Sequence, residues 1–571
     1  MMKKVVFLFS LVGAISVSLL NLSGKEPSLP DTASYIVMAS DVETAESSVR
    51  ELKASITRSL SIINGVVADL DNSQVSALRE QGLRVSPNAS VKSDSIKKPT
   101  DVLSSKASWR QIAQVDQSVI PYQMGALPMH DAGWYGDAIT VAIIDTGIAG
   151  LKHLNQDRYN RWRFYGTYNA VNDTIETFNT DTSGHGTHLA SIAVNSQLDI
   201  FDRYYGIAPD SQLLSIKAFD DSGAGNYMSV ISGIQFAIDY KDALNIRVLN
   251  LSFSAPAQSF YWDDPVNIAA MKAWQAGIVV VTSAGNEGAE PMSIGVPGNN
   301  PYVITVGAAT DNDTVADQSD DRIAKFSSMG PTMEGFAKPE ILGYGGHAVG
   351  LMDPYASLAV EHPEFHDGLN YFEMSGTSQA AATVSGAIAL LLEYHPHLTP
   401  DQVKCRLMAT AIPIMTPDGS EYETTFLQGA GRVDVTSAVL TTADNCANQG
   451  LDIAADLAGQ KHYLGTLAYS ESGDMQPAVE MLLNDGVLWR DGVLWRDGVL
   501  WRDGVLWRDG VLWRDGVLWR DGVLWRDGVL WRDGVLWRDT FIVDPAELGS
   551  DSPVELDLSI ATHTATWVEP D

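Results

Sequence analysis

Apolar runs alternate with helix-like segments through the middle of the chain. Two of the intervening segments, 227–239 and 266–276, have helical spacing, and the continuous apolar runs lie at 139–144, 213–217, 248–251, 278–281 and 303–306. Apolar strands without polar alternation are typical of parallel sheets that are buried on both faces. The pattern therefore predicts an α/β domain with a mostly parallel sheet and helices on both faces.

A leader and a small folded unit are expected before this domain. Lys3 and Lys4 precede an apolar run at 5–22 that small residues interrupt, which is typical of a secretory signal over 1–24. An N-terminal membrane anchor is the alternative interpretation. Segments that look like strand, helix, strand pair, helix and strand then follow at 35–38, 42–60, 62–69, 75–81 and 83–85. They predict a compact β-α-β-β-α-β unit, with a polar linker after it at 92–108.

Charge and length limit the classes of function. The 571 residues allow more than one folded unit, and 71 acidic against 38 basic residues give a net charge of −33. Such acidity argues against nucleic-acid binding and against docking on anionic lipid. Cys405 and Cys446 are the only cysteines, which excludes a four-thiolate zinc site. The two are either free or bridged, and bridging is compatible with an exported protein.

Three polar motifs stand among glycines and small residues. They are Asp145-Thr-Gly at the end of an apolar run, Gly-His-Gly-Thr-His around His185, and Ser-Gly-Thr-Ser ending at Ser378. Taken singly, these residues are explained as a turn cap, a core histidine and a helix N-cap. Their joint occurrence, with glycines that let the backbone approach a reacting group, indicates a catalytic site.

The order and contexts of the motifs resemble the subtilase family of serine peptidases over roughly residues 112–440. Further matching segments lie at 205–209, 218–225, 250–253, 282–288, 326–331 and 429–433. The resemblance implies a subtilisin-like α/β fold and a catalytic triad in which Ser378 attacks the scissile carbonyl. His185 would act as base and then as acid, and Asp145 would orient it. Asn286, with the backbone N–H of Ser378, would bind the oxyanion.

The resemblance also implies where a polypeptide binds. An extended chain would lie between 222–225 and 252–254 as an added strand, and 283–285 would line the pocket for the side chain before the cut. The candidate binding residues are Ser222, Gly223, Gly225, Ser252, Phe253, Ser254, Ser283, Ala284 and Gly285. Small residues at that pocket favour a broad or apolar preference. Catalysis needs no cofactor, and structural calcium is common in the family, although no acidic loop here has a defined ligand spacing.

The sequence departs from the family at several positions. Gln379 and Ala382 stand where the family usually has Met and Pro, and 350–371 looks like an insertion. His347, His362 and His366 lie in or near that insertion, but their irregular spacing favours a surface loop over a metal site. We interpret His188 as a structural residue that packs on the same helix face as His185.

A tandem repeat follows the domain. The hexapeptide Asp-Gly-Val-Leu-Trp-Arg occurs nine times without change over 485–538 and holds nine of the 15 Trp. Asp-Gly between β-prone runs favours a meander of hairpins, and a stacked solenoid is the second structural alternative. In function, the tract is either a recently expanded segment without selected activity or a surface module that binds carbohydrate or a partner through Trp. Because the tract is charge-neutral, the net charge of −33 lies on the other 517 residues.

The full prediction is a secreted serine endopeptidase that acts through an acyl-enzyme. Its divisions are a signal peptide (1–24), a propeptide and linker (25–110), a catalytic domain (111–446), a connecting segment (447–484), the repeats (485–538) and an acidic C-terminal segment (539–571). We expect an extracellular or cell-surface location, with the periplasm as an alternative, and no transmembrane segment after signal removal. The expected partners are protein or peptide substrates and its own propeptide. The alternative function is a weakly active or inactive homologue that serves as a surface binding or adhesion protein through its repeats.

Overall fold

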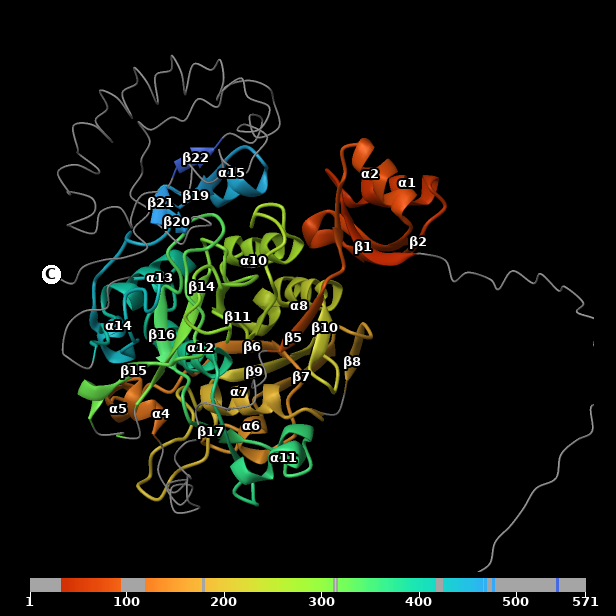
Figure 1. The fold of residues 1–571 in the computed structure, drawn as a ribbon. Helices are drawn as coiled ribbons and strands as arrows, with labels where there is room; N and C mark the ends of the chain where they lie inside the picture. The colour runs from red at the N-terminus through yellow and green to blue at the C-terminus, as the bar shows by residue number, and fades with distance from the viewer. Residues whose placement is uncertain are drawn as a thin grey trace, which may run out of the picture.

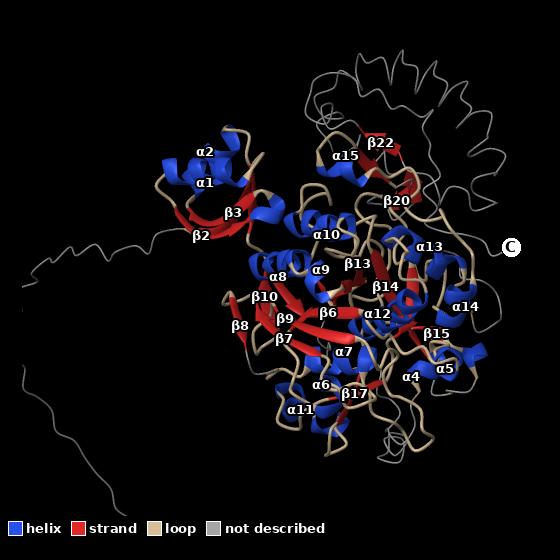
Figure 2. Cartoon of the chain, turned by 180° about the vertical axis from the view of Figure 1, so that it is seen from behind, coloured by secondary structure: helices blue, strands red, loops and turns tan. Residues whose placement is uncertain are grey.

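The computed structural model describes residues 32–93, 119–176, 180–311, 314, 317–416, 425–465, 467–469, 475–477 and 541–543 (Figure 1). The predicted signal peptide and the nine repeats lie outside the described residues. A small N-terminal unit, a large α/β domain and a short C-terminal extension make up the described part (Figures 1 and 2).

The N-terminal unit has the predicted β-α-β-β-α-β order. Its strands are β1 (Ala33–Met38), β2 (Ser55–Leu60), β3 (Gly65–Leu70) and β4 (Arg84–Pro87), and its helices are α1 (Val42–Glu51) and α2 (Asn72–Glu80). The strands form an antiparallel sheet in the order β2-β3-β1-β4. The prediction of one helix over 42–60 is wrong, because the helix ends at Glu51 and β2 follows. Residues 55–59 alternate between exposed and partly buried, which is the period of a strand, and the turn of the strand pair lies at 61–64.

A nine-stranded sheet forms the centre of the large domain. Its order is β15-β14-β13-β11-β6-β9-β7-β8, with β16 beside β14; β8 and β15 pair antiparallel with their neighbours and the other pairs are parallel. The strands are β6 (Thr140–Asp145), β7 (Phe164–Asn169), β8 (Thr174–Glu176), β9 (Gln212–Lys217), β11 (Ile246–Leu251), β13 (Val279–Ser283), β14 (Ile304–Thr310), β15 (Arg322–Ile323) and β16 (Ile341–Tyr344). Each of the five predicted apolar runs overlaps one of these strands.

Helices cover both faces of the sheet, as predicted. The helices α7 (His185–Val194) and α12 (Thr377–Tyr394) pack on one face, while α8 (Tyr227–Asp239) and α10 (Pro265–Gln275) pack on the other (Figures 1 and 2). A side chain at Gly386 of α12 would meet the carbonyl of Ala193 in α7 at 3.0 Å. The small residue therefore lets the two helices approach closely, and the first turn of each helix belongs to the candidate site.

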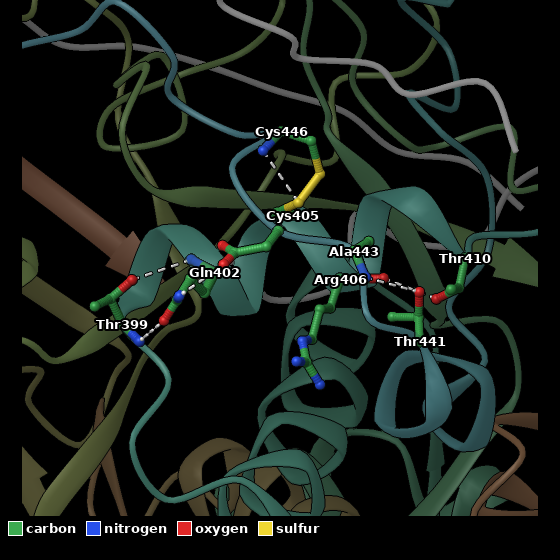
Figure 3. Close-up of a disulfide and its surroundings, with 9 residues drawn as sticks. Thr399, Gln402, Cys405, Arg406, Thr410, Thr441, Ala443 and Cys446 are labelled. Carbon is green, nitrogen blue, oxygen red and sulfur yellow. Dashed lines mark hydrogen bonds between the residues drawn. A yellow bond between two sulfur atoms is a disulfide. The ribbon is translucent and has the colours of Figure 1, made fainter.

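Shorter elements surround this core. The helices α4 (Ile120–Gln123), α5 (Leu127–Asp131), α6 (Lys152–Asn155), α9 (Lys241–Leu244), α13 (Pro400–Ala409) and α14 (Val435–Leu440) complete the domain. Cys405 of α13 is joined to Cys446 by a disulfide with a Cα–Cα distance of 5.1 Å (Figure 3). The bond ties the end of the predicted catalytic domain to α13 and resolves the question of pairing that the sequence left open.

The chain continues to pack on the domain beyond Cys446. Helix α15 (Ile453–Leu457) and strand β19 (His462–Leu464) follow, and Tyr463 and Leu464 are buried in the large hydrophobic core. Strand β22 (Phe541–Val543) pairs antiparallel with β19, and β20 (Leu467–Tyr469) pairs with β21 (Met475–Pro477). The segments on the two sides of the repeats, 462–464 and 541–543, therefore lie side by side.

A buried carboxyl group supports this C-terminal packing. The Oε1 atom of Glu334 accepts from the backbone N–H of Tyr261 and from the amide of Asn299, and its carbonyl accepts from the N–H of Gly465. The hydroxyl of Tyr261 in turn donates to Asp456 in α15. Burial of the charged form raises the pKa of Glu334 to about 7.

Glu334→Gln is expected to flatten the dependence of stability on pH. Because the folded-state pKa is raised, the contribution of Glu334 is fully present below its unfolded pKa and is lost as the pH rises through about 7. The difference from the ordinary value of 4.5 corresponds to about 3 kcal/mol of unfolding free energy. Urea unfolding at pH 5 and pH 8, in a Ser378→Ala background to prevent self-digestion, measures this; parallel pH profiles for both proteins would contradict it.

Candidate active site

Asp145 and His185 meet at the carboxyl end of the central strand β6. Asp145 is the last residue of β6, and His185 is the first residue of α7; both are fully buried. The ring Nδ1 of His185 donates to Oδ1 of Asp145 over 2.7 Å, and the N–H of Thr146 donates to the same oxygen over 2.8 Å. A carboxylate at this nitrogen leaves Nε2 as the basic atom of the imidazole.

A second buried carboxylate, Asp181, holds the start of α7 in place. It accepts from the N–H groups of Gly184 and Thr187 and from the hydroxyls of Thr187 and Thr146. Burial raises the pKa of Asp181, and these hydrogen bonds oppose that effect. From the sequence alone, Asp181, four residues before His185, had no assigned role. Its signal was an acidic residue a few positions before a helix start, where it can satisfy unpaired N–H groups.

Ser378 lies in the first turn of α12, as predicted. Its hydroxyl donates to the backbone carbonyl of Ser252 over 3.2 Å, and the hydroxyl of Ser252 donates to the carbonyl of Ser378. Asn250 at the end of β11 donates to the Ser252 hydroxyl over 2.7 Å and accepts from Ser385 of α12. These contacts fix the start of α12 against β11, where the positive end of the helix dipole favours a developing negative charge.

Asn286 is oriented by the residue before Ser378. Its Oδ1 accepts from both the N–H and the hydroxyl of Thr377, each at 3.0 Å, and the N–H of Gly285 donates to the same hydroxyl. Because Oδ1 is the acceptor here, Nδ2 is the donor end of the amide. Thr377 was quoted in the sequence motif but given no role, and it is the residue that links Asn286 to the start of α12.

A segment of the N-terminal unit lies along the predicted substrate edge. Strand β5 (Ser90–Ser93) pairs antiparallel with β10 (Ala224–Asn226) on one side and β12 (Phe253–Ser254) on the other. Gly225 is opposite Val91, and Phe253 is opposite Ser93. Val91 is buried with 1% of its surface exposed, so the added strand is an integral part of the packing.

The predicted binding residues divide into three groups. Gly225, Phe253 and Ser254 pair with β5, and Ser252 contacts Ser378, whereas Ser222 and Gly223 form a turn around Asp220 and lie outside this ladder. Ser283 is the last residue of β13, Ala284 and Gly285 follow it, and all three are buried beside β12. The hydroxyl of Ser283 donates to the carbonyl of Phe253, and a side chain at Gly285 would meet the hydroxyl of Ser254 at 3.3 Å.

The remaining histidines have structural contacts. Burial lowers the pKa of His188 to about 3, and its Nε2 donates to the carbonyl of Phe372. His347 contacts Glu373, and His366 is buried against the carbonyl of Met352. Within the described part of the chain, no group of three or more His, Cys, Asp or Glu is arranged to hold a metal ion. The helices that the structure describes include none with the length and apolarity of a membrane span.

The fold is that of a subtilisin-like α/β domain, and residues 136–431 match the sequence model of the subtilase family. The chain therefore belongs to the subtilase family. It is 37% identical over 274 residues to serine protease AprX of Bacillus subtilis, covering 47% of this chain and 60% of AprX. It is 32% identical over 308 residues to subtilisin DY of Bacillus licheniformis, covering 54% of this chain and 92% of that protein.

The fold comparison agrees with this assignment. Fervidolysin from Fervidobacterium pennivorans, described as a keratinolytic enzyme related to subtilisin, superposes with a TM-score of 0.56 at 20% identity, covering 78% of this chain and 64% of fervidolysin. The likeness confirms the predicted α/β architecture. The chain spans only about three-fifths of the length of AprX.

Proposed function

We propose that this protein is a secreted serine endopeptidase that hydrolyses peptide bonds through an acyl-enzyme. The buried hydrogen bond between Asp145 and His185 carries the proposal, because it gives the imidazole a basic Nε2. His185 takes the proton of Ser378 as the hydroxyl attacks, and then gives it to the leaving amine. A water molecule activated by the same imidazole hydrolyses the ester.

The oxyanion of each tetrahedral intermediate is held by two donors in this proposal. They are the side-chain Nδ2 of Asn286, in the loop after β13, and the backbone N–H of Ser378, in the first turn of α12; Thr377 joins the two segments. Donors that are already oriented before the reaction stabilise the developing charge without reorganisation. The mechanism needs no metal or organic cofactor, and a structural calcium ion remains a prediction.

Asn286→Ala is expected to lower kcat by about 10²–10³-fold, the loss that removing the same role causes in subtilisin. KM should change little, because the donor acts on charge that develops only in the transition state. Hydrolysis of a peptidyl anilide by the processed enzyme measures both parameters. Thr377→Val, which removes the hydroxyl's bond to Oδ1 and the acceptor of the Gly285 N–H but keeps the backbone bond to Oδ1, serves as the control and should lose less. Equal kcat in Asn286→Ala and wild type would exclude the oxyanion role.

We also propose that residues 25–110 form a propeptide and linker that the enzyme removes after export through the signal at 1–24. The support is the position of β5, which occupies the strand site between β10 and β12 that an extended substrate would need. Val91 is buried in this arrangement. The uncleaved N-terminal unit would thus block the cleft until the chain is cut.

The first cut is expected within a few residues after Ser93. Ser93 is opposite Phe253, and the hydroxyl of Ser378 contacts the carbonyl of the preceding residue, Ser252. Sequencing the N-terminus of the mature protein tests this position. Val91→Asp places a charge at a buried site of β5 and should slow the cut, whereas Lys53→Ala, at an exposed residue just after α1, should not. A mature N-terminus before β5 would contradict the proposal.

A further inference from the structure

The segment between β17 (Ala348–Leu351) and β18 (Tyr371–Met374) is hydrogen-bonded to the loop that precedes His185. We call residues 352–370, which include α11 (Ser357–Glu361), the insert. The N–H groups of Ser357 and Leu358 donate to the carbonyls of Thr182 and Ser183, just before His185. A side chain at Gly184 would meet the Cβ of Ala356 at 2.9 Å and Met352 at 3.0 Å. The insert therefore packs against the residue that precedes His185.

The base of the insert is anchored to α7 and to the segment just before α12. The N–H of Leu351 donates to the hydroxyl of Ser191 in α7 over 2.7 Å, and the carbonyl of Phe372 accepts from His188. The N–H of His347 donates to Ser375, three residues before Ser378. Met352, Ala356, Ala359, Phe372 and Met374 form a small hydrophobic core of their own. These contacts make the insert a defined structural element beside the site.

The insert presents apolar side chains and negative charge to the solvent. Tyr355, Val360 and Leu369 are exposed by 87%, 63% and 71%, and Tyr355 directly precedes the residue that touches Gly184. Residues 346–374 contain five Asp or Glu and no Lys or Arg. Exposed apolar groups framed by charge are typical of a binding surface. A partner for this surface should combine apolar and cationic side chains.

The other half of the cleft is already occupied in this structure. Strand β5 fills the edge formed by β10 and β12, and it represents the residues that precede a cut. The insert is attached on the side of His185, through the carbonyls of Thr182 and Ser183. An extended substrate has to continue past Ser378 and His185 after the scissile bond.

From these placements we propose that the insert binds the leaving-group side of the substrate and selects apolar and cationic residues after the scissile bond. The proposal rests on the peptidase function proposed above. The chain itself offers a matching sequence, because Ile96, Lys97 and Lys98 follow β5 closely. Tyr355 supplies apolar contact, and Glu361 and Glu364 supply the charge that favours lysine.

The test uses the processed full-length enzyme and three substrates with the same residues before the cut. One is an anilide with no residue after the cut, the second is a quenched peptide with Ile and Lys after it, and the third has Gly and Asp there. Wild type should favour the second over the third by about tenfold or more in kcat/KM. Two variants should each reduce that ratio to about threefold or less: the single variant Tyr355→Ala, and the double variant that combines Glu361→Gln with Glu364→Gln.

The controls separate binding from support of the catalytic loop. Tyr159→Ala removes another exposed tyrosine, on a loop near the other end of α7, and should leave the ratio as in wild type. If Tyr355→Ala lowers kcat/KM for the anilide and for both peptides by the same factor, the insert only supports the loop before His185 and the proposal is wrong. An unchanged ratio would also overturn it. Failure of the wild type to cleave the anilide would instead reject the peptidase function itself.

Discussion

Replacing Ser378 by alanine is expected to lower kcat by about 10⁶-fold, the loss caused by the same replacement in subtilisin. The side chain is the only protein nucleophile in the proposed mechanism, and its surroundings should survive the change. Alanine keeps the helix propensity of α12, and the lost hydroxyl makes a single hydrogen bond, to the carbonyl of Ser252. The large effect on turnover should therefore come with little loss of stability.

Two measurements check the Ser378→Ala result. A fluorophosphonate probe should label the processed wild type and leave the variant unlabelled. The variant should also keep residues 25–110, because self-cleavage needs the same hydroxyl. Ser385→Ala is a suitable control, since Ser385 lies two turns further along α12 and contacts Asn250 rather than the scissile bond. Labelling of Ser378→Ala, or normal removal of its N-terminal unit, would contradict the assignment of the nucleophile.

Local motifs indicated the candidate catalytic residues because their proposed chemistry depends on neighbours in the sequence. A glycine on each side of His185, and a strand end at Asp145, are visible without a fold. The contacts between motifs were less accessible. The role of Asp181 depends on four separate donors that converge on its carboxylate. The role of Thr377 depends on Asn286, a partner 91 residues away in the sequence. A motif shows that such residues occur, but only the fold shows what they hold.

Long-range pairing explains most of what the sequence could not predict. Strand β5 pairs with segments more than 130 residues away, and no local pattern marks four residues as an added strand. The disulfide between Cys405 and Cys446 likewise depends on a Cα separation that the fold sets. The burial of Tyr463 depends on contacts with Tyr261, again far along the chain. The wrong prediction over 42–60 has a local cause instead. Residues 55–59 already show the alternation of a strand, but they were included in the predicted helix.

Asp145→Asn is expected to lower kcat by about 10⁴-fold while the fold is retained. Oδ1 of Asp145 accepts from both His185 and Thr146, and the second oxygen has no hydrogen-bond partner in the described structure. The amide is nearly the same size, so packing around this fully buried residue should change little. It carries no charge to stabilise the imidazolium, and an amide N–H directed at His185 would favour the wrong tautomer.

The decisive comparison is between two buried carboxylates at the same helix start. Asp181 accepts four hydrogen bonds, but it does not contact His185. Asp181→Asn should therefore reduce thermal stability more than Asp145→Asn does, and it should reduce kcat much less than Asp145→Asn does. Combining Asp145→Asn with Ser378→Ala should add nothing to the loss from Ser378→Ala alone, because the two residues act as a unit. Retention of kcat within tenfold in folded Asp145→Asn would show that His185 does not need this carboxylate, and would remove the observation on which the peptidase proposal rests.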